Sequence, residues 1–308
     1  MCGIAGDLRF DGTDSDPAAL MAMADVMAPR GPDGSGLVMR GAAGLAHRRL
    51  KIIDLSEAGR QPMEDSELGL TLAFNGCIYN HKALRAELEA KGYQFFSTSD
   101  SEVILKAYHA WGLDCVQRFN GMFAFAIRER DSGKTVLARD RMGIKPLYLA
   151  DTPDGLRFAS SLPALLAAGN IDRTIDPVAL HHYFSFHAVV PAPHTLFKGI
   201  RKLPPATVLE ISKDGERKQR GYWQPDYDPL PEERDLTADD WHDRVESELK
   251  AAVRRRLVAD VPVGVLLSGG LDSSLIVGLL DDAGATELNT FSIGFETVGE
   301  EKGDEFEY

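Results

Sequence analysis

The feature that most constrains the fold is a change, near residue 221, in how strands and helices follow one another. Before it, the expected strands come in runs: 3–10, 36–39, 70–75, 122–128, 135–139, 147–150 and 157–159, with helices expected at 17–28, 81–91 and 101–111. Strands in runs favour an α+β architecture with largely antiparallel sheets. After it, we expect a helix at 238–257, a strand at 263–267, a helix at 273–280 and a strand at 288–294. That order is typical of a parallel, doubly wound α/β domain.

The stretch between the two patterns, residues 221–237, is rich in proline and acidic residues and is predicted to be a linker. Charge changes at the same place: residues 226–308 hold 7 Lys and Arg against 21 Asp and Glu, whereas residues 1–225 hold 27 against 26. We therefore predict a first domain over 2–220 and the N-terminal part of a second over 238–308. Two strands are too few to close a doubly wound sheet, so the second domain is expected to be incomplete.

Composition excludes several classes of protein. With 44% hydrophobic and 26% charged residues the chain is an ordinary globular one, and its three cysteines cannot form a disulfide framework. No apolar run approaches the roughly 18 residues of a membrane span. The first residues carry no basic leader, and no basic stripe suits nucleic acid. We expect a cytoplasmic protein that binds neither membrane nor nucleic acid.

Cys2 carries the strongest chemical signal near the N-terminus. Removal of Met1 would leave this cysteine with a free α-amine, whose ordinary pKa of roughly 7.7–8.0 lets it take the thiol proton near neutral pH. Nucleophile and base would then belong to one residue, and Gly3 would let a substrate approach the backbone closely. The alternative is an incidental cysteine at a frayed terminus.

Cys2 does not stand alone, because several other motifs follow in a defined order. They are Cys2-Gly3-Ile4-Ala5-Gly6, Arg30-Gly31-Pro32-Asp33-Gly34, the stretch from His47 to Asp54, Phe74-Asn75-Gly76-Cys77-Ile78-Tyr79-Asn80, Ser99-Asp100-Ser101-Glu102-Val103 and the stretch from Asp140 to Tyr148. This set resembles the glutamine-hydrolysing domain of class II, N-terminal-nucleophile amidotransferases, most closely in the asparagine synthetase (glutamine-hydrolysing) family. The resemblance implies an αββα sandwich for the first domain.

The resemblance also implies roles for individual residues. Cys2 would be the nucleophile that forms a thioester and releases ammonia, with the Asn75 amide and the Gly76 N–H as oxyanion hole. Glutamine would be held by Arg49 at its α-carboxylate, by backbone groups of Leu50, Ile52 and Ile53, and by Asp100 at its α-ammonium. The alternatives are a surface ion pair for Arg49, a helix N-cap for Asp100 and a turn for Asn75-Gly76. His47 and Arg48 are expected to be structural.

One residue departs from the family pattern. Much of the family has Asn-Gly-Glu where this chain has Asn75-Gly76-Cys77, so a second carboxylate near the substrate ammonium is absent. We do not expect Cys77 to replace Cys2, since no α-amine lies beside it. Cys115 is expected to be a buried apolar filler.

A second site is predicted where Ser268-Gly269-Gly270-Leu271-Asp272-Ser273-Ser274 follows a strand and opens a helix. Backbone N–H groups at such a place favour an anion, and the motif resembles the pyrophosphate loop of ATP pyrophosphatase enzymes. The resemblance implies ATP contacts at Leu267, Ser268, Gly269, Gly270, Asp272, Ser273 and Ile293, with Mg²⁺ bridging the phosphates and no metal ligand identified. The alternative is a glycine-rich turn in which Asp272 and Ser273 cap the helix.

Together the two sites imply a glutamine-hydrolysing, ATP-dependent amide ligase. Ammonia from glutamine would displace AMP from an adenylated carboxylate. The acceptor is aspartate or an acetylated glutamine dipeptide, as in the N-acetylglutaminylglutamine amidotransferases, which the Asn-Gly-Cys variant and the acidic tail at 294–308 favour. A plain glutaminase or amidohydrolase and a non-catalytic module remain as alternatives, and a homodimer stays open.

Overall fold

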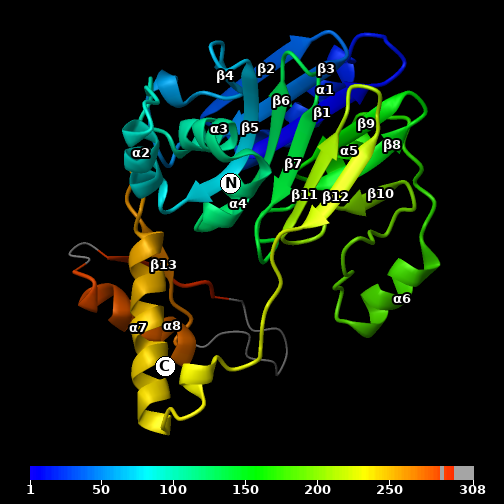
Figure 1. The fold of residues 1–308 in the computed structure, drawn as a ribbon. Coiled ribbons are helices and arrows are strands. Elements are labelled where there is room, and N and C mark those ends of the chain that lie inside the picture. Colours follow the sequence, from blue (N-terminus) through cyan, green and yellow to red (C-terminus); the bar gives the residue numbers. More distant parts are fainter. Residues whose placement is uncertain (285–287, 295–308) are drawn as a thin grey trace. The chain divides into compact units, whose positions relative to one another are not determined.

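Two six-stranded antiparallel sheets form the centre of residues 1–225 (Figure 1). The first sheet has the strand order β10 (Ile200–Lys202), β8 (Tyr148–Thr152), β9 (Gly155–Ala159), β1 (Gly3–Arg9), β3 (Ala43–Arg49) and β2 (Gly34–Arg40). The second has the order β12 (Arg217–Gly221), β11 (Thr207–Ile211), β7 (Thr135–Arg139), β6 (Gly121–Glu129), β5 (Leu70–Ile78) and β4 (Met63–Asp65). This computed structural model describes residues 1–284 and 288–294. The chain divides into two compact units, Met1–Pro225 and Asp226–Tyr308.

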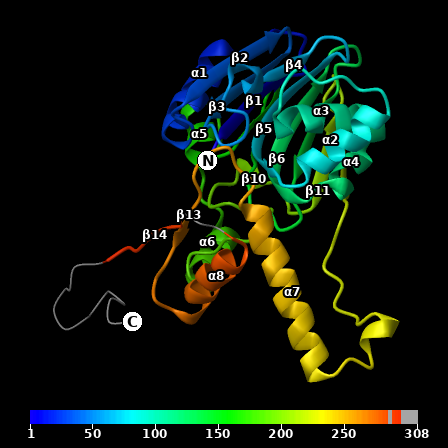
Figure 2. The ribbon, with the colours of Figure 1, turned by 90° about the vertical axis from the view of Figure 1, so that its left-hand side faces the viewer.

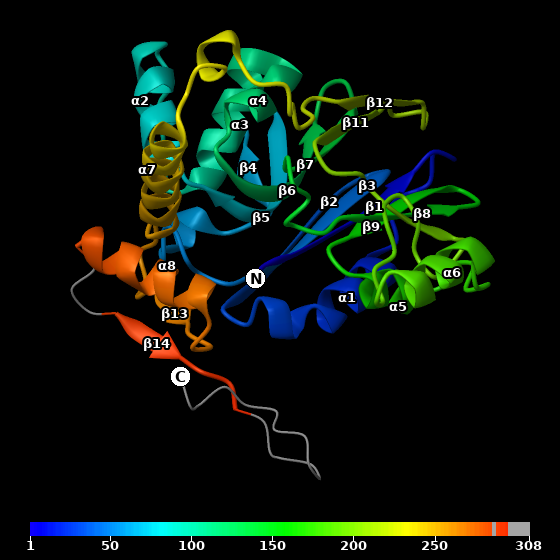
Figure 3. The ribbon, with the colours of Figure 1, turned by 90° about the horizontal axis from the view of Figure 1, so that it is seen from below.

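The sheets of the first unit pack face to face because successive side chains of a strand point to opposite sides. In β5, Ala73 belongs to the core between the two sheets, together with Ile4 of β1, whereas Leu72 and Phe74 pack under helices. The outer face of the second sheet is covered by α2 (His81–Ala90), α3 (Asp100–Trp111) and α4 (Cys115–Arg118), and that of the first sheet by α1 (Pro17–Val26) and α5 (Leu162–Ala167). Figures 2 and 3 show the four layers edge-on. The predicted αββα sandwich is confirmed.

Several elements of this unit were not predicted. They are β3, β4, β10, β11, β12, α5 and a further helix, α6 (Pro177–Ser185). The expected helices at 17–28, 81–91 and 101–111 are present with shifted ends. Asp176 accepts hydrogen bonds from Val178 and Ala179 at the start of α6, and Pro177 occupies its first turn, so this helix carries ordinary start signals.

The second unit contains α7 (Ala238–Arg256), β13 (Gly264–Leu266), α8 (Leu271–Asp282) and β14 (Asn289–Phe291). Thr237 caps α7 by accepting the N–H of Asp240, whose carboxylate accepts the N–H of Thr237 in return. The strands pair in parallel, and both helices contribute to a small core of Val253, Leu279 and Leu280. This is the expected beginning of a doubly wound α/β domain. The predicted strand at 288–294 lies within the described residues and is present as the shorter β14, whereas residues 295–308 of the acidic tail lie outside them.

Over residues 1–284 and 288–294, no helix has both the length and the apolar character that crossing a bilayer requires.

Candidate active site

Cys2 lies directly before β1, and its sulfur contacts the residue that follows β3. The backbone N–H of Leu50 donates to Cys2 Sγ at 3.3 Å, and the thiol donates weakly to the Leu50 carbonyl at 3.6 Å. The pairing of Gly3 with Arg48 brings these two chain segments together. Arg30 Nε donates to the Cys2 carbonyl at 3.2 Å. Cys2 is therefore held at its sulfur and at its backbone, and the alternative of a frayed terminus is wrong.

Gly3 is confined by packing against the residue that follows α1. A Cβ atom at this position would lie 2.9 Å from Cβ of Met27, the residue that follows α1. The helix layer above the first sheet therefore restricts this position to glycine. The expected role of Gly3 in substrate approach stays a prediction.

Burial shifts the pKa values of the two ionisable groups at the N-terminus. Burial raises the pKa of the Cys2 thiol above its ordinary value, although the Leu50 hydrogen bond opposes the shift. The α-amine, which belongs to Met1 in this chain, has a lowered pKa, first through burial and then through the charges of Arg30 and Lys145. A neutral amine is the form that accepts a proton. Burial therefore favours the neutral form of both groups, the thiol and the amine.

Arg49 shapes the loop that follows β3. Its side chain is buried, and its guanidinium donates to the backbone carbonyls of Ser56, at 2.9 Å, and Asp54. Gly59 packs against it so closely that a Cβ there would lie 2.4 Å from Nη2. The alternative of a surface ion pair is wrong, because Arg49 is buried and donates to carbonyls.

The three hydrophobic residues predicted beside Arg49 lie in that same loop. Leu50 contacts the Cys2 sulfur, as described, whereas Ile53 is half-buried and the Ile52 side chain is exposed. The structure therefore places Leu50 at the Cys2 sulfur, and it places Ile52 and Ile53 farther along the loop.

Asn75 and Gly76 lie inside β5 and not in a turn. Asn75 pairs with Ala124 of β6 and is 1% exposed, yet among the described residues neither its Oδ1 nor its Nδ2 has a hydrogen-bond partner. Leaving such a group unsatisfied costs about 1–3 kcal/mol, so its presence requires an explanation. A side-chain amide that is kept free for a ligand supplies one. Gly76 is confined by β6, because a Cβ would lie 2.2 Å from the Met122 carbonyl oxygen.

Asp100 is the first residue of α3, and it does not cap this helix. The cap is Ser99, whose hydroxyl accepts the N–H of Ser101 at 3.1 Å. The Asp100 carboxylate instead accepts the backbone N–H of Ile78, at the end of β5, at 2.9 Å. Burial raises the pKa of Asp100 to about 6, against the effect of that hydrogen bond, and its charge in turn acts on the Cys2 thiol.

Two cations near Cys2 belong to the sequence motifs, although the sequence alone predicts no role for either cation. One is Arg30, described above. The other is Lys145, which is 5% exposed and is held at both backbone groups, by Asp140 Oδ2 at 2.9 Å and by Arg139 Nε at 2.8 Å. Burial lowers the pKa of Lys145, and Cys2 is the first of the charges that act on it. Each motif contains a basic residue that the sequence shows. Its position near Cys2 could not be predicted, because Cys2 lies far away along the chain.

The other two cysteines are buried. The pKa of the Cys77 thiol is raised to about 12, mainly by burial and then by the negative charge of Asp100. A thiol of that kind stays protonated near neutral pH, which supports the expectation that Cys77 does not replace Cys2. Cys115 packs in the core between the second sheet and its helices, as predicted.

The loop between β13 and α8 carries the second predicted site. Gly269 has a φ of +89°, a conformation that favours glycine, and Gly270 is the N-cap of α8. Ser268 Oγ lies 3.2 Å from Ser273 Oγ, which donates to the Gly270 carbonyl. The reading of Asp272 and Ser273 as caps is therefore wrong.

The strand ends beside this loop are joined directly. The Leu267 N–H donates to the Phe291 carbonyl at 2.9 Å, and the Leu267 carbonyl accepts from Ser292 Oγ at 2.6 Å. Ile293 follows immediately and is exposed. The structure thus places Leu267 and Ile293 at neighbouring ends of the two parallel strands, next to the glycine loop.

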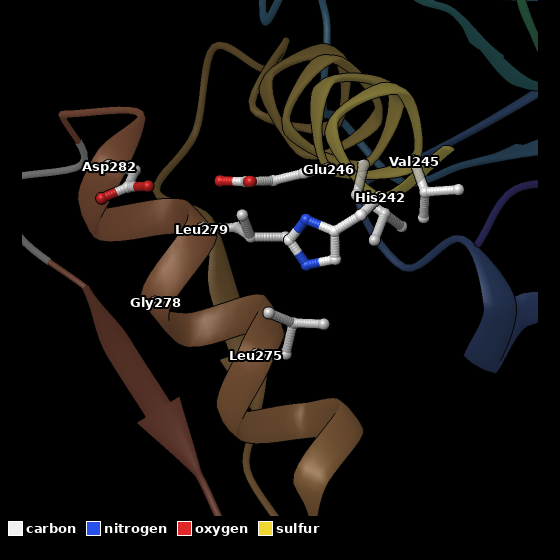
Figure 4. Close-up of a pocket in the computed structure, with 8 residues that line it drawn as sticks. His242, Val245, Glu246, Leu275, Gly278, Leu279 and Asp282 are labelled. Carbon is white, nitrogen blue, oxygen red and sulfur yellow. The ribbon is translucent and has the colours of Figure 1, made fainter. Parts of the chain in front are cut away.

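A separate pocket of about 500 Å³ lies between α7 and α8 (Figure 4). Its walls include His242 and Glu246 of α7 and Leu275 and Asp282 of α8. The exposed side chains of His242, Asp243 and Glu246 bring possible metal-ligand atoms within 4.8 Å of one another. Lys250 pairs with Glu246 at 2.7 Å and with Asp282 at 3.3 Å, so the two carboxylates share one positive charge. None of the predicted ATP-site residues lines this pocket.

Comparison with known proteins agrees with both units. Residues 1–223 match the model of the glutamine amidotransferase domain, and residues 244–308 match that of asparagine synthase. Asparagine synthetase [glutamine-hydrolyzing] 3 of Bacillus subtilis is 38% identical over 96% of this chain and 48% of its own length. A putative asparagine synthetase 2 of Methanocaldococcus jannaschii is 36% identical over 96% of this chain and 60% of its own length. Amidase chyE of Penicillium rubens is 33% identical over 92% of this chain and 43% of its own length.

The chain therefore spans about half the length of the curated relatives it matches. Among solved structures, the glutamine phosphoribosylpyrophosphate amidotransferase of Bacillus subtilis has the same fold, with a TM-score of 0.55 and 17% identity over 97% of this chain and 68% of that one. The matched family models, the relatives and the two-sheet sandwich agree with the motifs around Cys2. The chain belongs to the glutamine amidotransferase family of enzymes, and relatives that it matches are named as glutamine-hydrolysing asparagine synthetases.

Proposed function

We propose that residues 1–225 hydrolyse glutamine at Cys2 and that the ammonia serves an ATP-dependent amide ligase. The observation that carries the proposal is a sulfur fixed by Leu50 in a first unit that also contains a buried side-chain amide, Asn75, which has no hydrogen-bond partner within residues 1–284 and 288–294.

In the proposed reaction, the α-amine of Cys2, freed by removal of Met1, takes the thiol proton. The sulfur attacks the carboxamide carbon, and the developing oxyanion is stabilised by Asn75 Nδ2 and the Gly76 N–H. A donor of this kind is typically worth 10²–10³ in rate. The amine returns its proton to the leaving nitrogen, so ammonia departs and a thioester remains, which water hydrolyses to glutamate.

The free end of glutamine would be held by two buried charges. Arg49 is fixed by the loop carbonyls of Asp54 and Ser56, so its planar guanidinium is already oriented for the α-carboxylate. Asp100 is the proposed partner of the α-ammonium. It acts without the second carboxylate of many relatives, because Cys77 occupies that place.

For the second unit we propose ATP, with Mg²⁺, at the loop formed by Ser268, Gly269, Gly270, Asp272 and Ser273. The residues fit a phosphate group, because a glycine at positive φ leads into the N-terminus of the 12-residue helix α8 and two serine hydroxyls line the turn. Leu267 and Ile293 would contact the nucleotide. Bound ATP would activate an acceptor carboxylate, proposed to be aspartate, with the acetylated dipeptide as the alternative, in the cytoplasm.

The test of the glutaminase proposal compares two cysteine variants of the 308-residue chain. Cys2→Ala should lose glutamate release from glutamine by at least 10³-fold, whereas Cys77→Ala should keep it within about threefold, because only Cys2 has the adjacent amine. Glutamate is measured by a coupled assay, and intact mass confirms that Met1 is absent. Activity that survives in Cys2→Ala would overturn the proposal.

A stand-alone amidohydrolase is the second candidate, and similarity to proteins named amidase favours it. The two functions differ in their need for nucleotide. Formation of AMP from ATP by the full-length protein with an acceptor present supports the ligase, and amide cleavage without any nucleotide turnover supports the amidohydrolase.

A further inference from the structure

We infer that His47 and Gln61 are positioning residues for Asn75, because their side chains bind both peptide groups of the preceding residue, Phe74. The inference rests on the proposed function in one respect, that Asn75 is the oxyanion donor. We call these two side chains and the Phe74 peptide groups the Phe74 clamp.

The first arm of the clamp is His47 of β3. Its Nε2 lies 2.9 Å from the Phe74 carbonyl oxygen, so Nε2–H donates and joins the two sheets. Burial lowers the pKa of His47 to about 4, which keeps the ring neutral near pH 7. The neutral ring has one N–H, and Nδ1, which then lacks a proton, has no partner among the described residues. The tautomer with hydrogen on Nε2 follows from these contacts.

The second arm is Gln61, which replaces a missing strand partner. β4 pairs Met63 with Leu72 and Asp65 with Leu70, so the same register would place residue 61 opposite Phe74. The chain leaves the ladder there, and the side chain supplies the bond: Gln61 Oε1 accepts the Phe74 N–H at 2.7 Å. Gln61 Nε2 then donates to Ser101 Oγ at 3.0 Å, on α3 directly after Asp100.

Asn75 depends on its backbone for position, because its own amide has no hydrogen bond to hold it among the residues described. The position of the Asn75 side-chain amide is therefore set by the backbone of β5. The clamp fixes both peptide groups of the residue before it, at a point where the neighbouring strand has ended. Small displacements matter here, since an oxyanion donor acts only within about 2.7–3.1 Å of the charge.

The clamp also fixes Asn75 relative to the other functional groups. His47 is paired with Ile4 of β1, and three residues later, directly after the end of β3, Leu50 holds the Cys2 sulfur. Gln61 connects β5 to the start of α3, where Asp100 binds the Ile78 N–H. The N–H and carbonyl groups of Phe74 thus connect three parts of the proposed site. These are the nucleophile, the oxyanion donor and the carboxylate that binds the ammonium.

The experiment uses the 308-residue chain with His47→Leu, His47→Gln and Gln61→Met, and with Tyr108→Phe as matched control. Glutamine Nε2 reaches nearly the place of histidine Nε2, so His47→Gln keeps the donor whereas His47→Leu removes it. Tyr108→Phe removes a different hydrogen bond of the same helix layer, from Tyr108 Oη to Glu129 at 2.6 Å.

For glutamine hydrolysis, we expect His47→Leu and Gln61→Met to lower kcat by about 10–100-fold with KM within about twofold, as expected when a transition-state contact is lost. His47→Gln should recover kcat to within about threefold of the wild type, and Tyr108→Phe should leave it unchanged. A kcat that falls equally in Tyr108→Phe, or that is not recovered by His47→Gln, would show a merely structural role and overturn the inference.

A second measurement does not depend on catalysis. Amide hydrogen exchange at residues 74–76 should accelerate in His47→Leu beyond the change in global stability and return toward wild type in His47→Gln. Unchanged exchange there overturns the clamp. A wild-type chain that forms no thioester would overturn the proposed function alone, because the exchange data still decide whether these side chains position Asn75.

Discussion

Asp100 is the residue whose charge sets the acidic limit of the proposed glutaminase site. Its pKa of about 6 lies above the ordinary value of 3.8 because the carboxyl is buried. Since the folded state holds the proton more tightly than the unfolded state, this carboxyl opposes folding above about pH 6 and ceases to do so as the pH falls below about 4. The binding of the glutamine ammonium depends on pH in the opposite direction. It needs the ionised Asp100 carboxylate, so it weakens as the pH falls.

We therefore predict that KM for glutamine rises about tenfold between pH 7 and pH 5, as expected for a group with a pKa of about 6. Asp100→Asn should have a high KM at both values and no such dependence. Steady-state rates of glutamate release, measured in buffers of constant ionic strength, check this. A wild-type KM that stays flat over the range would contradict the assignment of Asp100.

Some residues of the site could be predicted from the sequence and others could not. Cys2, Asn75, Arg49 and Asp100 belong to motifs whose residue types already suggest their chemistry. Lys145 could not be assigned, because its position beside Cys2 depends on a loop held by Asp140. A partner for His47 could likewise not be predicted from the sequence, because its hydrogen bond to β5 crosses from one sheet to the other.

The element α3 is anchored by a buried ion pair. Lys106 Nζ lies 2.5 Å from Asp65 Oδ2 at the end of β4, and both side chains are buried. Asp65 also accepts the N–H of Leu68, so its carboxylate closes the turn after β4. Breaking such a pair on one side leaves an uncompensated charge, which costs more than losing both charges.

Lys106→Met should accordingly lower the free energy of unfolding by about 3–5 kcal/mol. The double variant Lys106→Met with Asp65→Asn should recover much of this loss, because asparagine still accepts the Leu68 N–H without carrying a charge. Urea denaturation measures both. Equal losses in the single and double variants would show that the pair anchors α3 by packing and not by charge.

Elements were predictable where burial shaped their pattern. The helix at 101–111 was found from its apolar spacing, and α3 is indeed buried along most of its length. β12 is exposed at every residue and exists because it pairs with β11, so no hydrophobic pattern marks it. β4 and β10 span three residues each, too few for a periodic signal. β11, a buried run from Thr207 to Ile211, carried a signal that we missed.

At the scale of the whole molecule, the two units have separate cores. Three core clusters lie within residues 1–225 and the fourth is formed by α7 and α8 with their neighbours. The change in element order near residue 221 was enough to predict two fold classes. The order of strands within each sheet was not predictable, because partners distant in sequence are chosen by packing.

Residues 1–225 should therefore fold alone. We predict one cooperative thermal transition for that fragment, with a midpoint within about 3 °C of the corresponding transition of the 308-residue chain, measured by calorimetry. Limited proteolysis of the intact chain should cut first within residues 223–237, which are mostly exposed and carry one short 3₁₀ turn. An insoluble fragment, or first cleavage inside either sheet, would contradict this division.

The anchoring of Cys2 has a practical consequence for handling the protein. Because the Leu50 N–H binds the sulfur and Arg30 binds the carbonyl oxygen, the position of Cys2 is fixed. A purification tag fused ahead of it would put an amide nitrogen, which is not basic, where the proposed chemistry needs an amine. Recombinant protein should carry its affinity handle at the other end, and host cells need enough methionine aminopeptidase to trim every molecule.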